Sequence, residues 1–211
     1  YTKRFRAAAL AYGDPGRVLM IGGGTYTFPT ALINSFPDMK VDVVEIDPVL
    51  DELARRYFYL KDSPRLTIHH ADGRTYLNGD NGKYDIVYMD AFSSLSPPFQ
   101  LTTRQAIERI ESSLSPRGAA VVNLIGEYDN GTGEYLRAVQ ATYGSAFKYV
   151  GMYPAAPGSA LEGRQNFIMH ATNSRETAEK LTKAAGGKVL AFRGNGLVLT
   201  DNYAPIERLT F

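Results

Sequence analysis

Cysteine is absent from this chain of 211 residues. Its absence excludes disulfide bonds, thiolate ligands for a metal ion and a cysteine nucleophile. It also fits a reducing compartment, and we expect the protein in the cytoplasm. Long apolar runs are missing too. No stretch of about 18 apolar residues occurs, so we expect no part of this chain to insert into a membrane.

An excess of charge of one sign is also lacking. The 23 Lys and Arg residues nearly balance the 22 Asp and Glu residues, for a net charge of +1. Basic residues form no run, so nucleic acid is not an expected partner. The three histidines have no partners at metal-ligand spacing. We therefore expect strand or surface histidines and no metal site.

What is present is an alternation of short apolar runs with helical patterns. The predicted strands cover residues 17–21, 40–47, 66–70, 84–89 and 119–124, with two more at 147–152 and 166–170. The predicted helices cover residues 30–36, 49–59, 102–114 and 134–143, and a turn is expected at 115–118. Strands separated by helices predict right-handed crossovers and a parallel sheet. The last two strands have no clear helix between them and predict an antiparallel edge.

This pattern indicates one α/β domain over residues 1–211, with the Rossmann-like sheet of S-adenosylmethionine-dependent methyltransferases. Ligands bind such sheets beyond the carboxyl ends of the strands. Gly22, Gly23 and Gly24, followed by Thr25, come directly after the first predicted strand. They allow close approach to a ligand or form a tight turn. The third glycine of the dinucleotide fingerprint is replaced by Thr27, which argues against NAD or FAD.

Three acids follow three further predicted strands. Glu45 stands about 20 residues beyond the glycines and can accept hydrogen bonds from ribose hydroxyls; the alternative is a solvated strand end. Asp72, before Gly73, can accept from an adenine amino group, although Asp-Gly is also a common turn. Asp90 faces the place where a reacting atom would lie; the alternative is a helix cap or a loop carboxylate.

These residues together resemble the spermidine synthase family, over roughly residues 1–126. The resemblance rests on Tyr1, the run RVLMIGGG from Arg17 to Gly24, Glu45-Ile46-Asp47, Asp72-Gly73 and Asp90. It implies a co-substrate of the S-adenosyl type, with Glu45 on the ribose, Asp72 on the adenine and Asp90 as general base. By the same resemblance, Tyr1 helps to position a small amine acceptor.

Two departures separate the chain from the family pattern. Thr25 stands where the family has an Asp that anchors the aminopropyl amine, and Ser93 stands where it has a second Asp near the acceptor. We therefore expect an acceptor of lower charge than a typical polyamine, or one held by residues outside this chain. The N-terminal β-rich domain of the family is absent from this sequence.

Residues 90–103 and 199–207 resemble the divergent spermidine-synthase-like proteins, some of which are fused to a transporter-like membrane region. We expect a segment upstream of Tyr1, and such a fusion would account for it. A homodimer is also left open. The aromatic run Tyr57-Phe58-Tyr59 is expected to pack one helix end on the sheet.

Three functions remain open. The first is aminopropyl transfer from decarboxylated S-adenosylmethionine to an amine. The second is methyl transfer from S-adenosylmethionine, which Thr25 permits because it does not repel the methionine carboxylate. The third is a non-catalytic module that binds or senses an S-adenosyl nucleoside.

Overall fold

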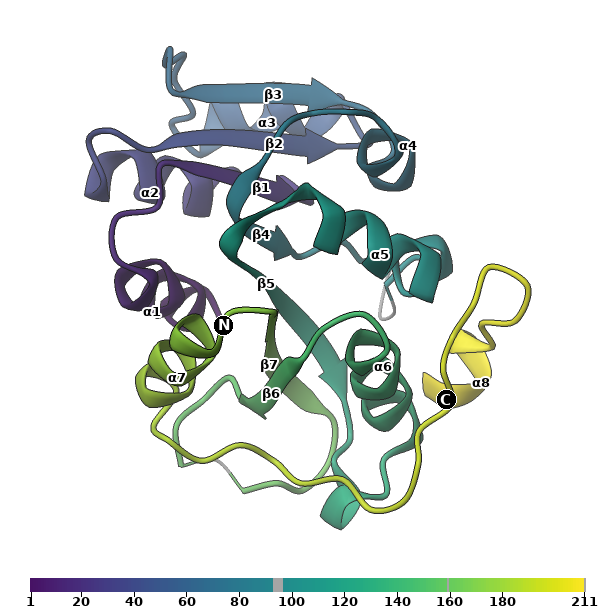
Figure 1. Ribbon diagram of the computed structural model, residues 1–211. Coiled ribbons are helices and arrows are strands. Elements are labelled where there is room, and N and C mark those ends of the chain that lie inside the picture. Colours follow the sequence, from purple (N-terminus) through teal and green to yellow (C-terminus); the bar gives the residue numbers. More distant parts are fainter. Residues whose placement is uncertain (93–96, 159, 211) are drawn as a thin grey trace.

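A seven-stranded sheet organises the chain in the computed structural model, which describes residues 1–92, 97–158 and 160–210 (Figure 1). The strands are β1 (Arg17–Ile21), β2 (Lys40–Glu45), β3 (Leu66–His70), β4 (Tyr84–Met89), β5 (Leu114–Gly126), β6 (Tyr149–Pro154) and β7 (Gln165–Thr172). Their order is β3-β2-β1-β4-β5-β7-β6. Strands β1 to β5 are parallel, and β7 is antiparallel to both β5 and β6. The predicted parallel sheet with an antiparallel edge is confirmed.

Helices cover both faces of this sheet. One face carries α1 (Thr2–Tyr12), α2 (Thr27–Ser35), α3 (Val49–Tyr57) and α7 (Arg175–Ala184). The other carries α4 (Gly73–Asn78), α5 (Arg104–Ser113), α6 (Glu134–Gly144) and α8 (Ile206–Thr210). Short 3-10 turns occur at Phe99–Leu101 and Asp129–Gly131.

The central strands supply both hydrophobic cores. In β1, Leu19 and Ile21 pack under α4 to α6, whereas Val18 and Met20 pack under α1 and α2. Successive side chains of a strand point to opposite faces, so a strand covered on both sides must be apolar throughout. This is why short continuous apolar runs predicted the strands.

Several helices differ from the prediction. Helices α1, α4, α7 and α8 were not predicted, and α2 begins at Thr27 rather than at residue 30. Pro29 lies in the first turn of α2, where a proline needs no N–H partner and does not delay the helix. Helix α7 carried an overlooked start signal, because the Ser174 hydroxyl accepts a hydrogen bond from the Thr177 N–H.

Two other expectations were wrong. The turn expected at 115–118 lies inside β5, where the pairing register with β4 jumps from Leu114 to Ala119 and the strand bulges. The aromatic run does not pack on the sheet, since Tyr57, Phe58 and Tyr59 are 56%, 46% and 86% exposed. Tyr59 adopts a left-handed conformation (φ 58°), and the chain turns there so that Leu60 enters the core instead.

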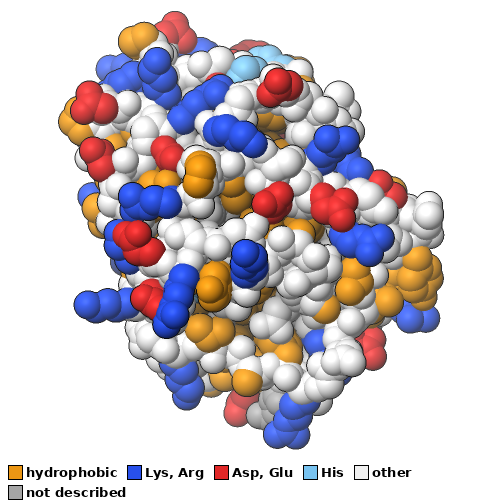
Figure 2. Space-filling model, viewed as in Figure 1, with side chains coloured by type: hydrophobic (Ala, Val, Ile, Leu, Met, Phe, Trp, Pro, Cys, Tyr) orange, Lys and Arg blue, Asp and Glu red, His pale blue; other side chains and the backbone are white. Residues whose placement is uncertain are grey.

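Charges of both signs are interspersed over the face shown in Figure 2, without a broad patch of either sign. The longest helices, α1 and α6, have 11 residues each. Within residues 1–92, 97–158 and 160–210, no helix has the length and apolar character needed to cross a bilayer.

Candidate nucleoside-binding site

A cavity of about 710 Å³ opens at the carboxyl ends of the parallel strands, around the loops that follow β1 and β4. The strand order reverses between these two strands, and ligands bind at such a switch point in open α/β sheets. Ser93 lies outside the described residues. The other residues predicted for the site all line this cavity: Tyr1, Gly22, Gly23, Gly24, Thr25, Glu45, Asp72, Gly73 and Asp90.

Close backbone approach explains the glycines that shape the cavity. Gly22 has a φ of +96°, and a Cβ atom there would lie 2.4 Å from the carbonyl oxygen of Asp90. A Cβ atom on Gly73 would lie 2.8 Å from Cγ2 of Ile21. A larger residue at either position would push the loops apart, so glycine brings the ends of β1, β3 and β4 around one space.

Glu45 ends β2 and is only 6% exposed. Its Oε2 atom accepts hydrogen bonds from the N–H groups of Gly23 and Gly24, at 2.8 and 3.2 Å. Its Oε1 atom accepts the N–H of Asp47 at 3.0 Å. A carboxylate has about four acceptor positions, so one remains for a ligand. Glu45 therefore fixes the shape of the glycine loop and also faces the cavity. The sequence did not predict the first of these roles.

Asp72 caps helix α4, because its Oδ1 atom accepts the N–H of Thr75 at 2.9 Å. Its other carboxylate oxygen has no hydrogen bond to any described residue and is available to a ligand. The structure therefore shows a helix cap at Asp72 in place of the alternative Asp-Gly turn, and this cap is compatible with ligand binding through the second oxygen. Thr25 places its hydroxyl 3.0 Å from that of Thr27, at an exposed edge of the cavity.

Asp90 follows β4 and takes part in a chain of side-chain hydrogen bonds. The Asn123 amide donates to its Oδ1 atom at 2.9 Å. The Asn166 amide donates in turn to Oδ1 of Asn123 at 3.0 Å, which fixes the orientation of Asn123. The Tyr1 hydroxyl also donates to the Asp90 carboxyl group. Three separate parts of the chain thus hold Asp90 in place.

Burial raises the pKa of Asp90, and the hydrogen bonds from Asn123 and Tyr1 oppose this rise. Burial also raises the pKa of Tyr1, with a further contribution from the nearby Asp90 carboxylate. Tyr1 therefore remains a protonated donor at neutral pH. The carboxylate is held ready to accept a proton, since desolvation disfavours its charged form.

Sequence reasoning missed Asn123, Asn166, Ile206 and Glu207. Asn123 is 4% exposed in an otherwise apolar stretch of β5, and this polar residue in a buried strand was a usable signal. Its partner Asn166 lies on β7, so the contact depends on the antiparallel pairing of these strands. Ile206 and Glu207 line the cavity from the far end of the chain, and no local pattern indicates this.

The charged side chains around the cavity are of one sign. Among the described residues, its lining includes the carboxyl groups of Glu45, Asp72, Asp90 and Glu207, and no Lys, Arg or His side chain. No group of three or more Asp, Glu or His side chains that could hold a metal ion occurs in the described ranges. The arrangement favours a cationic organic ligand.

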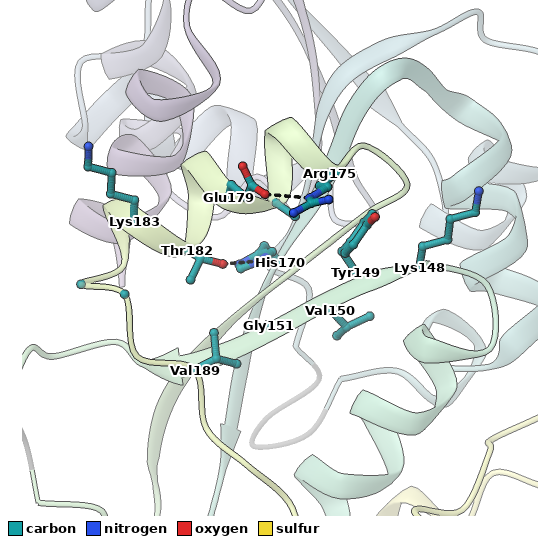
Figure 3. Close-up of a pocket in the computed structure, with 13 residues that line it drawn as sticks. Lys148, Tyr149, Val150, Gly151, His170, Arg175, Glu179, Thr182, Lys183 and Val189 are labelled. Atoms are coloured by element: carbon teal, nitrogen blue, oxygen red, sulfur yellow. Dashed lines mark hydrogen bonds and ion pairs between the residues drawn. The ribbon is translucent and has the colours of Figure 1, made fainter.

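A larger depression of about 810 Å³ lies between β6 and α7 (Figure 3). Lys148 and Lys183 stand at its opposite ends and point apart, while Arg175 pairs with Glu179 at 2.9 Å. His170 is 2% exposed, and burial lowers its pKa to about 4, so the ring is neutral at pH 7. Despite its volume, this depression has no converging functional groups, and we do not regard it as the site.

Comparison with known proteins agrees with this placement. Residues 6–180 match the family model of the spermine/spermidine synthase domain. The polyamine aminopropyltransferase of Vibrio vulnificus (strain CMCP6) is 35% identical over 150 residues, which are 70% of this chain and 48% of that protein. The chain spans about half the length of the curated aminopropyltransferases that it matches.

Solved structures share the fold. A probable spermidine synthase from Corynebacterium glutamicum ATCC 13032 has a TM-score of 0.71 at 24% identity, covering 91% of this chain and 73% of that chain. Human methyltransferase-like protein 13, in complex with SAH, has a TM-score of 0.70 at 24% identity, covering 98% of both chains. These similarities confirm the Rossmann-like fold of S-adenosylmethionine-dependent methyltransferases.

Proposed function

The chain belongs to the spermine/spermidine synthase family, and on that premise we propose that it transfers an aminopropyl group from decarboxylated S-adenosylmethionine to a small amine. The observation that carries the proposal is the position of Asp90. Its carboxyl group lies in the cavity of the glycine loop, is held by Asn123 and Tyr1, and has a raised pKa. These are the properties of a general base for an amine.

The reaction is a displacement at carbon. The lone pair of the acceptor nitrogen forms a bond to the propyl carbon next to the sulfonium sulfur. The carbon–sulfur bond breaks, its electron pair stays on sulfur, and methylthioadenosine leaves as a neutral thioether. Because the neutral thioether needs no proton to leave, no acid catalyst is required. The proton lost by the amine passes to Asp90. Fixing donor and acceptor in line supplies much of the remaining acceleration.

We assign the nucleoside contacts to the two acids on the neighbouring strand ends. The remaining acceptor position of Glu45 receives a ribose hydroxyl, and the free oxygen of Asp72 receives the adenine amino group. Gly22, Gly23, Gly24, Thr25 and Gly73 form the surface against which the nucleoside lies. Tyr1 and Ser93 stay assigned to the acceptor side.

The charge of the cavity favours the decarboxylated donor. Decarboxylated S-adenosylmethionine carries a sulfonium and an ammonium group and no carboxylate. The carboxylate of S-adenosylmethionine would enter a space lined by Asp and Glu, without a Lys, Arg or His side chain among the described lining residues. Like charges that share a cavity repel each other, and an unpaired buried charge costs further free energy.

Methyl transfer is the second candidate, and Thr25 is the observation that favours it. This position lacks the carboxylate that anchors the aminopropyl amine in the family pattern, so a methionine carboxylate meets no repulsion there. A non-catalytic sensing module is the third candidate. The cytoplasmic location, the homodimer and the single domain over residues 1–211 stay predictions.

Product analysis separates these candidates. The chain is incubated with a mixture of small amines and with each donor in turn, and the nucleoside product is identified. Aminopropyl transfer releases methylthioadenosine from the decarboxylated donor, whereas methyl transfer releases S-adenosylhomocysteine from S-adenosylmethionine. In the control Asp90→Asn, turnover should fall about 10²–10⁴-fold, the usual contribution of a positioned general base. No product with either donor would contradict the proposal and favour the sensing module.

A further inference from the structure

The part of the chain that follows α7, here called the C-terminal segment, lines one side of the cavity. Ile206 and Glu207, at the start of α8, line the same space as Tyr1 and Asp90. Ile206 is 4% exposed and packs into the core beneath α5 and α6. Glu207 is exposed, and its carboxylate has no hydrogen bond or ion pair with any described residue.

This segment is held firmly although it has little regular structure. The backbone N–H of Leu199 donates to the Thr142 hydroxyl at 3.0 Å, and the Leu199 carbonyl accepts the N–H of Arg104 at 2.8 Å. At the other end, the Arg164 guanidinium donates to the carbonyl of Thr210 at 2.9 Å. The backbone that carries Glu207 is therefore fixed at both ends.

Asp201 adds a third attachment. Its two carboxylate oxygens accept hydrogen bonds from the Arg74 guanidinium at 3.2 and 2.8 Å. The Thr103 hydroxyl donates to the same group at 2.5 Å. Arg74 comes directly after Gly73 in the first turn of α4, next to the cavity. The C-terminal segment and α4 are thus joined by a bidentate pair, which fixes geometry as well as charge.

The other carboxyl groups of the cavity already have roles. Three of about four acceptor positions of Glu45 are filled by the backbone. Asp72 caps α4, and its second oxygen is assigned to the adenine amino group. Asp90 is the proposed base. Glu207 is the only carboxylate among the described lining residues that remains for a second cationic group.

We propose that Glu207 is a specificity-determining residue that binds the distal ammonium group of a linear diamine acceptor. The inference rests on the proposed function, in which the other nitrogen of the diamine reacts beside Asp90. Glu207 would thereby replace, from a different part of the chain, the carboxylate missing at Ser93. A monoamine lacks the second ammonium group and gains nothing from Glu207.

The test is a calorimetric titration of 1,4-diaminobutane and of 1-aminobutane into protein saturated with methylthioadenosine. Glu207→Gln should weaken diamine binding about five- to thirtyfold, the range for losing a hydrogen bond to a charged group, and leave monoamine binding unchanged. Glu207→Asp keeps the charge and should retain most of the diamine affinity. Glu52→Gln removes an exposed helical carboxylate outside the cavity and should behave as the parent does.

Equal diamine affinity in the parent and in Glu207→Gln would overturn the assignment, as would an equal loss in Glu207→Asp and Glu207→Gln. A parent that does not bind the diamine would overturn it as well. The proposed transfer can fail separately. A parent that binds the diamine through Glu207 but forms no methylthioadenosine from the decarboxylated donor would contradict the transfer and support the contact.

Discussion

Asp90 is an acidic residue whose partly buried position disfavours the charged form of its side chain. Its folded-state pKa is raised, with burial as the main cause, so the folded state binds the proton more tightly than the unfolded chain does. Protonation therefore stabilises the fold, and this contribution is lost as the pH rises through the raised pKa. A raised pKa of a carboxyl group in a cavity is typical of a functional site.

Asp90→Asn should therefore raise the melting temperature at pH 7, because the amide removes a partly desolvated charge and still accepts from Asn123. The gain should shrink as the pH falls toward the ordinary aspartate pKa of about 3.9, since Asp90 is then protonated in both states. Thermal unfolding of the parent and the variant across this range measures the effect. A variant less stable than the parent at pH 7 would show that the carboxylate has a structural role.

Glu45 has a structural role, because its buried carboxylate accepts hydrogen bonds from three backbone N–H groups. Glu45→Gln replaces one acceptor oxygen with an amide NH₂ that faces those donors. We expect the free energy of unfolding without ligand to fall by about 1–3 kcal/mol, the cost of unpaired buried groups. Affinity for methylthioadenosine should fall by a similar amount. Denaturant titration measures the free energy of unfolding, and calorimetry measures the affinity. An unchanged free energy of unfolding would exclude a structural role for the Glu45 carboxylate.

At the scale of elements, the C-terminal segment is held by contacts with the rest of the chain more than by its own secondary structure, and Asp201 makes one of these contacts. The Thr103 hydroxyl and the Arg74 guanidinium both lower the pKa of Asp201. A lowered folded-state pKa means that this contribution is present at neutral pH and is lost as the pH falls through the folded value. The attachment should therefore weaken only in acid.

Asp201→Ala should loosen the segment around residue 201 and make the chain between residues 187 and 205 more susceptible to proteolysis at neutral pH. Asp38→Ala is a matched control, because Asp38 is an exposed acid remote from the segment. Limited proteolysis followed by mass spectrometry locates the cleavages. The same digestion pattern in Asp201→Ala and in the parent would contradict the role of this pair.

The strands could be predicted from sequence because a strand that is buried on both faces has a recognisable local pattern of residues. Strands covered on both faces appear as continuous apolar runs, and all seven predicted strands overlap observed ones. Helices were harder. Helix α4 has only six residues, and α8 has five. Segments this short are marginal in isolation and are stabilised by tertiary packing.

The residues of the site also differ in how far the sequence could predict them. Glu45, Asp72 and Asp90 could be predicted because the carboxyl ends of parallel strands lie at one edge of the sheet. Asn123 contacts Asp90 only because β5 is the neighbour of β4, and its orientation depends on Asn166 across the antiparallel pair. Glu207 depends on where the chain returns after α7. Such contacts are properties of the tertiary structure, and no local pattern encodes them.

At the scale of the whole molecule, charge is balanced overall and segregated within the cavity. The chain has a net charge of +1, yet the described lining of the cavity carries four carboxyl groups and no Lys, Arg or His side chain. The carboxyl groups of the cavity are expected to select among donors by their charge. A donor with two positive groups is attracted, and a donor with an added carboxylate loses part of that attraction.

The measurement that tests this account most directly is a calorimetric comparison of decarboxylated S-adenosylmethionine with S-adenosylmethionine on the same protein. The two ligands differ only in the carboxylate, so the ratio of their dissociation constants isolates the charge of the cavity. We expect the decarboxylated donor to bind at least about tenfold more tightly, a difference of about 1.4 kcal/mol. Equal or tighter binding of S-adenosylmethionine would contradict the account and favour methyl transfer.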